Sequence, residues 1–152
     1  MTSFADVRGE SVDVLLVEDN PGDVRLIEEA FAEVDVKVTF HTATDGDEAL
    51  SILRECQNDP SCPYPDLVLL DLNLPRVNGF DVLEAIRSES EYPPLPVIVL
   101  TGSEAEEDVR RSYQEFANAY LTKPAGPDEF VAMAEAVEDF WLDTARLPST
   151  SC

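Results

Sequence analysis

Basic side chains are scarce in this sequence. Its 152 residues include 10 Lys and Arg against 32 Asp and Glu, which gives a net charge of −22 at pH 7. A surface this acidic repels other polyanions, so we expect neither nucleic acid nor a membrane surface as a direct partner. Intrinsic disorder would also fit a high charge, but the apolar content of 44% and a clear hydrophobic periodicity argue against it. We hypothesise that this heavily carboxylated surface is an adaptation to a high-salt cytoplasm.

Long hydrophobic runs are absent as well. No stretch approaches the roughly 20 apolar residues that a membrane-spanning helix needs. The first ten residues, MTSFADVRGE, lack the basic start and apolar stretch of a secretory signal. We therefore expect a cytoplasmic protein.

Cysteine and histidine are few. The three cysteines are Cys56, Cys62 and Cys152, and His41 is the single histidine. An odd and small number of cysteines fits a disulfide framework poorly. Cys56 and Cys62 flank QNDPS in a predicted loop with no histidine nearby, so we predict free thiols on a surface loop rather than a metal pair.

Short aliphatic segments alternate with longer amphipathic ones along the whole chain. Predicted strands cover 12–17, 37–43, 67–70, 97–100 and 118–122, and a helix follows each of them. Helix starts are indicated by Asn20 with Pro21, by Asp45, by a capping-box pattern of Ser103 and Glu106, and by Gly126 with Pro127. The last helix carries Phe130, Ala134, Val137 and Trp141 on one face.

This strict alternation predicts an α/β fold. Strands that are aliphatic throughout suit a parallel sheet that helices cover on both faces. Five such units predict an open, doubly wound five-stranded sheet of the flavodoxin-like kind with strand order 2-1-3-4-5, whereas an eightfold barrel would need about 250 residues. We expect a folded domain over 11–142, an N-terminal extension over 1–10, a loose tail over 143–152, and no output domain.

Polar side chains stand where the predicted strands end. Glu18 and Asp19 follow the first strand, Asp71 follows LVLL of the third, Thr101 ends the fourth, and Lys123 follows the fifth. Sites in this architecture form outside the carboxyl ends of the strands. Carboxylates held together repel one another, and an all-oxygen ligand set suits Mg²⁺. With Lys123 and Thr101 to bind phosphoryl oxygens, the set predicts phosphoryl transfer to a carboxylate nucleophile, Asp71.

Four blocks of the sequence resemble the signature blocks of response-regulator receiver domains, which belong to the CheY-like superfamily. The blocks are LLVEDNPGDVRLIEEAF, DLVLLDLNLPRVNGFDVL, PVIVLTGSE and NAYLTKP. The resemblance implies that Asp71 is the phosphoacceptor. It also implies that Mg²⁺ is bound directly by Asp19, through water by Glu18, and by the backbone carbonyl of Asn73.

The same resemblance assigns roles to three further positions. Thr101 matches the switch hydroxyl, Tyr120 the switch aromatic and Lys123 the lysine of the family, and Pro124 implies a cis Lys-Pro bond. EDNPGDVRLIEEAF and the long loop from Cys56 to Asp66 resemble most closely the stand-alone regulators that partner phytochromes. The implied partners are a sensor histidine kinase and a downstream protein target or phosphotransfer protein, with a homodimer possible.

Plainer interpretations stay open at this point. Glu18 and Asp19 could act only on the helix dipole, Lys123 could be a surface lysine, and Tyr120 a half-buried strand aromatic. Ser103 is expected to cap a helix rather than to touch phosphate. A phosphohydrolase of small substrates is a second hypothesis, because Asp71-Leu72-Asn73 resembles the nucleophile motif of haloacid dehalogenases. Against it, that family has a second aspartate where Asn73 stands here. A pseudo-receiver that only binds partners is a third, while an acidic rim argues against a flavin carrier.

Overall fold

A parallel sheet of five strands organises the chain. The computed structural model describes residues 12–59, 61–62, 64–75, 77–88 and 95–139. The strands lie in the order β2-β1-β3-β4-β5, all in parallel. Their bounds are β1 Val12–Val17, β2 Val38–Ala43, β3 Leu67–Leu70, β4 Val97–Thr101 and β5 Ala119–Thr122. The predicted fold class and strand order are confirmed.

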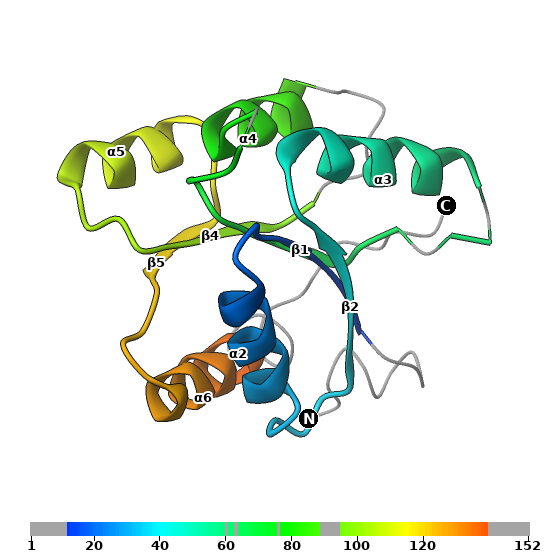
Figure 1. Cartoon of the computed structure of the whole chain (residues 1–152). Helices are drawn as coiled ribbons and strands as arrows, with labels where there is room; N and C mark the ends of the chain where they lie inside the picture. Colours follow the sequence, from blue (N-terminus) through cyan, green and yellow to red (C-terminus); the bar gives the residue numbers. More distant parts are fainter. Residues whose placement is uncertain (1–11, 60, 63, 76, 89–94, 140–152) are drawn as a thin grey trace.

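Helices cover both faces of this sheet. In Figure 1, α3, α4 and α5 lie on one face, and α2 and α6 lie on the other. Their bounds are α2 Pro21–Phe31, α3 Gly46–Asn58, α4 Gly79–Ser88, α5 Glu106–Gln114 and α6 Pro127–Val137. Among the residues that the structure describes, no helix is long and apolar enough to cross a membrane.

Each central strand contributes to two separate cores, because successive side chains of a strand point to opposite faces. On β1, Leu15 and Val17 join the core under α3 and α4, whereas Val14 and Leu16 join the core against α2 and α6. All four residues of β3 are buried, at 1% exposure or less. Burying each such side chain is worth about 1.5–3 kcal/mol, so the carboxyl ends of these strands are held firmly in place.

Most of the predicted helix N-caps are observed in the structure. The Asn20 side chain accepts hydrogen bonds from the amides of Gly22 and Asp23, and Asp45 accepts one from Glu48. Pro127 follows the N-cap Gly126 of α6, as predicted. The capping box of Ser103 and Glu106 is wrong, since α5 begins at Glu106 with Ala105 as its N-cap. The Ser103 hydroxyl instead donates to the Asp108 carboxylate at 2.6 Å.

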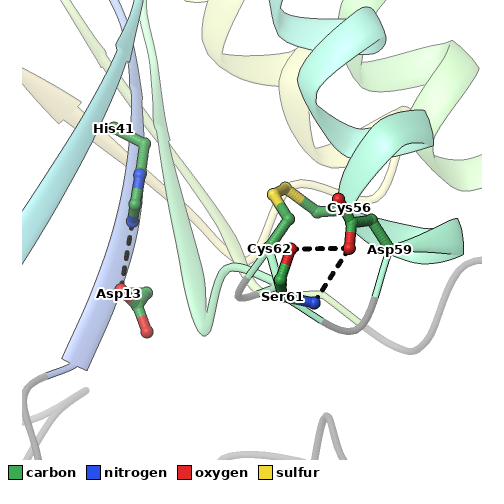
Figure 2. Close-up of a disulfide and its surroundings, with 6 residues drawn as sticks. All are labelled: Asp13, His41, Cys56, Asp59, Ser61 and Cys62. Carbon is green, nitrogen blue, oxygen red and sulfur yellow. Dashed lines mark hydrogen bonds and ion pairs between the residues drawn. A yellow bond between two sulfur atoms is a disulfide. The ribbon is translucent and has the colours of Figure 1, made fainter.

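Two further predictions are wrong. Cys56 and Cys62 are joined in a disulfide, with their Cα atoms 4.7 Å apart (Figure 2). Cys56 lies within α3, which extends to Asn58, and is buried, so only Cys62 lies on the loop that follows the helix. No cis peptide bond occurs among the described residues, so Lys123 and Pro124 are joined by the trans bond, the lower-energy isomer. Trp141 and the two terminal segments lie outside the described residues.

Candidate functional site

The ends of β1 and β3 bring the first two acidic side chains together. Val17 pairs with Leu70 at the end of the shared ladder, and the Asp71 amide donates to the Val17 carbonyl at 3.0 Å. Glu18 and Asp71 therefore follow the ends of neighbouring strands, and both are buried, at 1% and 4% exposure. The aliphatic strands thus position both carboxylates at the same edge of the sheet.

Lys123 reaches this pair from the end of β5. Its Nζ atom lies 2.6 Å from Glu18 Oε1, 2.8 Å from Asp23 Oδ2 and 3.0 Å from Asp71 Oδ2. Burial by itself would lower the pKa of Lys123, but the hydrogen bonds to Asp23, Glu18 and Asp71 outweigh it and hold that pKa above its ordinary value. Lys123 is therefore a permanent positive charge shared by three carboxylates.

Glu18 shows that the shared ammonium does not satisfy all of these acids. Burial, the largest influence, raises the pKa of Glu18 to about 7. The hydrogen bond from Lys123 lowers this pKa, whereas the nearby Asp71 charge raises it. A site in which a buried carboxylate tends to keep its proton would gain from a second cation.

The donor set fits a hard divalent cation. Oxygens of Glu18, Asp19 and Asp71 all lie within 4.8 Å of one another, and Asp19 is the exposed member. Carboxylates without nitrogen or sulfur ligands suit Mg²⁺, which keeps several waters and accepts a mixed ligand shell. The predicted acidic trio is thus brought together. Asn73 lies beside it, since its amide donates to Asp71 Oδ1 at 3.1 Å.

At the other side of the site, the hydroxyls of Thr101 and Tyr120 both bond to the backbone of Ser103. Thr101 is fully buried at the end of β4, and its Oγ1 accepts from the Ser103 amide at 3.5 Å, which leaves its own proton available to donate. The Tyr120 hydroxyl donates to the Ser103 carbonyl at 2.8 Å. Burial raises the pKa of Tyr120, so this hydroxyl stays protonated. The loop after β4 therefore links Thr101 to the aromatic side chain on β5.

Asp23 is the site residue that sequence reasoning missed. It lies in the first turn of α2, where an acidic side chain is explained by the helix dipole alone. Only the folded chain shows that its carboxylate reaches Lys123, one hundred residues away. Its position three residues after Asn20 was visible in the sequence, but nothing local indicated the direction of its side chain.

Known proteins are similar to this chain in sequence and in fold. Residues 14–135 match the response regulator receiver domain family. The response regulator Rcp1 of Synechocystis is 38% identical over 136 residues, which cover 90% of this chain and 92% of Rcp1. The probable methanogenesis regulatory protein FilR2 of Methanothrix harundinacea is 36% identical over 135 residues, 89% of this chain and 86% of FilR2.

Solved structures agree with these relatives. The phosphorylated cyanobacterial phytochrome response regulator RcpA superposes with a TM-score of 0.83 at 42% identity, covering 91% of this chain and 99% of RcpA. The Mn²⁺-bound form of Rcp1 gives a TM-score of 0.81 at 37% identity, with 91% and 99% covered. The chain belongs to the response regulator receiver domain family. It is a two-component phosphorelay response regulator, as its sequence blocks predicted.

Proposed function

We propose that Asp71 accepts a phosphoryl group from the phosphohistidine of a sensor histidine kinase. The observation that carries this proposal is the convergence of Asp71, Glu18 and Lys123 from the carboxyl ends of β3, β1 and β5, with Lys123 Nζ 3.0 Å from Asp71 Oδ2. Attack by an Asp71 oxygen on phosphorus forms the acyl phosphate, and the phosphorus–nitrogen bond of the donor breaks. The histidine leaves with the bonding electron pair and takes a proton.

Each surrounding group has a proposed role in that transfer. A bound Mg²⁺ would neutralise charge on the phosphoryl oxygens, and its ligands would be Asp19, Asp71, the Asn73 backbone carbonyl and, through water, Glu18. The Rcp1 relative has been solved with Mn²⁺ bound, which supports a metal role for the matching acidic residues here. Lys123 places its positive charge beside the same phosphoryl oxygens.

The signal would leave the site through Thr101 and Tyr120. The buried Thr101 hydroxyl can donate to a phosphoryl oxygen on Asp71, and the loop at Ser103 already connects it to the Tyr120 hydroxyl. A shift of Thr101 toward the phosphoryl group would move this loop and the Tyr120 side chain with it. The surface of α5, β5 and α6 would then present a different shape to a partner.

Partner and location follow from the relatives and the charge. A phytochrome-type histidine kinase is the proposed donor, because RcpA is a phytochrome response regulator. A downstream protein, a phosphotransfer protein or a second copy of this chain would read the switched surface, in the cytoplasm and without nucleic acid or membrane. Receiver domains are generally signalling modules, and we propose that this one catalyses only its own phosphorylation and dephosphorylation.

Intact-protein mass spectrometry tests the proposal directly. The chain is exposed to a small-molecule phosphodonor with and without Mg²⁺, as wild type, as Asp71→Asn and as Asp81→Asn, a control at an exposed carboxylate in the first turn of α4. We expect one added phosphoryl group that requires both Mg²⁺ and Asp71 and persists in the control. An adduct that survives in Asp71→Asn would contradict the assignment. Repeated turnover of the donor would favour the phosphohydrolase, and no adduct at all the pseudo-receiver.

A further inference from the structure

The disulfide at the end of α3 lies outside the proposed phosphoacceptor site. Cys56 and Cys62 are joined where α3 gives way to the loop that leads into β3 (Figure 2). Asp71 stands at the opposite, carboxyl end of β3. The two sites are therefore separated by the length of that strand, and the cysteine pair needs its own explanation.

Cys56 occupies a core position of α3. It follows Ala49 and Leu53 on the buried stripe of the helix, and it is itself 8% exposed. Cys62 is only half-buried. The pair thus joins an inward-facing helical side chain to a more accessible one on the adjoining loop. An external reagent would meet the sulfur of Cys62 first.

Hydrogen bonds that do not involve sulfur hold the loop in this position. The Asp59 carboxylate accepts from the Ser61 amide at 2.9 Å and from the Ser61 hydroxyl at 2.7 Å. The Cys62 amide donates to the Asp59 carbonyl at 3.0 Å. These bonds turn the chain back beneath α3, as Figure 2 shows for Asp59 and Ser61. Because they form independently of the disulfide, they would keep the two cysteines close in the reduced protein as well.

The backbone spacing of the two cysteines is compatible with a disulfide. The Cα atoms of Cys56 and Cys62 are 4.7 Å apart, which lies within the range of about 4.4–6.8 Å that disulfides require. A preformed turn at this spacing raises the effective concentration of one thiol at the other. The fold therefore favours formation of the disulfide, and the half-buried Cys62 leaves the bond accessible to thiol–disulfide exchange.

We infer that Cys56 and Cys62 are a redox-responsive dithiol whose oxidation clamps the α3–β3 loop. The oxidant is a small-molecule disulfide. The Cys62 thiolate attacks one of its sulfurs and releases the first small thiolate, and the Cys56 thiolate then attacks Cys62 Sγ and releases the second. Two protein thiols are oxidised by two electrons, one external disulfide is reduced to two thiols, and their protons pass to the released thiolates.

The test uses the full chain with Cys152→Ser, so that only the pair can react. The reduced protein is titrated with mixtures of hydroxyethyl disulfide and mercaptoethanol, a neutral couple that the net charge of −22 does not repel. Intact mass reports the loss of two hydrogens. An endoprotease that cuts before Asp59 separates the two cysteines, so the fragments stay linked only by their disulfide. We expect a single reversible transition to the linked form.

A second readout checks that the bond clamps the loop. Oxidised protein should melt about 5 °C above reduced protein, because the bond restricts the unfolded chain, and Cys62→Ser should melt like the reduced form under both conditions. Asp59→Ala should lower the equilibrium constant for forming the Cys56–Cys62 disulfide at least about fivefold, which is the effect of losing roughly one net hydrogen bond. Mixed disulfides on both cysteines, failure of the couple to close or reopen the pair, or equal melting temperatures would each overturn the inference. No phosphodonor is involved, so the outcome is independent of the proposed function.

Discussion

Glu18 is a buried acid whose proton has consequences for stability. Its pKa in the folded chain is raised from 4.5 to about 7, chiefly by burial. A raised pKa means that the folded state binds the proton more tightly than the unfolded state does. The stabilising contribution is complete below pH 4.5 and is lost as the pH rises through about 7. Near neutral pH the ionised side chain therefore lowers the free energy of unfolding.

Glu18→Gln isolates this effect because glutamine does not titrate. The measurement uses metal-free protein with a chelator present. The unfolding free energy of the wild type, taken relative to that of Glu18→Gln, should fall steadily as the pH rises from 4.5 through about 7. Urea denaturation across that pH range measures it. A difference that is constant with pH would show that Glu18 ionises normally in the folded chain.

Lys123 stabilises three carboxylates at once, so its removal should be costly. Its side chain is 14% exposed and contacts Glu18, Asp23 and Asp71. Lys123→Met leaves these acids without their cation, and we expect the unfolding free energy to drop by about 3 kcal/mol in the absence of Mg²⁺. Denaturation at mildly alkaline pH measures the drop.

Lys37→Met provides the matched control, since Lys37 is exposed between α2 and β2. Its unfolding free energy should change by less than about 0.5 kcal/mol. Added Mg²⁺ should restore part of the stability that Lys123→Met loses, because a divalent cation can neutralise the same acids. Equal effects of the two substitutions would contradict the shared-ammonium arrangement.

At the scale of elements, the start of α4 packs directly on the site. Gly79 donates its amide to the Leu72 carbonyl at 2.9 Å, and a Cβ atom there would collide with the Asp71 carbonyl oxygen and the Leu72 Cα. These neighbours are backbone atoms and cannot rotate away. The glycine therefore lets α4 approach the segment that carries Asp71.

Gly79→Ala should destabilise the chain by about 1–3 kcal/mol, the usual penalty of overpacking. It should also slow the formation of the Asp71 adduct, because the clash acts on the backbone of Asp71 itself. Gly102→Ala is the control, since a Cβ at Gly102 meets nothing within 4 Å. Thermal unfolding compares the two variants, and an unchanged melting temperature for Gly79→Ala would refute the close approach.

At the scale of the whole molecule, negative charge is the dominant feature. The net charge is −22. The ion pairs Arg25–Glu29, which is exposed, and Arg111–Glu115, which is partly exposed, are of the weak kind that joins residues four apart on a helix. Self-repulsion of this surface opposes the compact state. Salt shortens the Debye length from about 30 Å at 0.01 M to about 3 Å at 1 M and so removes the repulsion.

We expect the melting temperature to rise by about 5 °C or more between these two salt concentrations, equivalent to roughly 1–2 kcal/mol for a domain of this size. Differential scanning calorimetry in sodium chloride measures the rise. A neutral osmolyte at equal osmolality serves as the control and should not reproduce it. Stability that is unchanged from low to molar salt would refute a salt-adapted surface.

Much of this molecule follows from local patterns in the sequence. The aliphatic segments, their spacing, and the caps at Asn20, Asp45 and Gly126 predicted five strands and five helices in their observed order. Parallel strands place their carboxyl ends at one edge of the sheet, so the sequence alone predicted that Glu18, Asp71, Thr101 and Lys123 lie at the same edge. The start of α5 shows the limit of local patterns. Ser103 was predicted to cap the helix, but its hydroxyl donates to the Asp108 carboxylate instead.

The sequence by itself determined the element order, the sheet and the residues at its carboxyl edge, because hydrophobic period and helix caps act over a few residues. Only the tertiary structure decided that Asp23 shares Lys123 and that Cys56 meets Cys62. Both depend on the direction of a side chain after the chain has turned. That direction is set by packing and by hydrogen bonds such as those of Asp59, which local pattern does not specify.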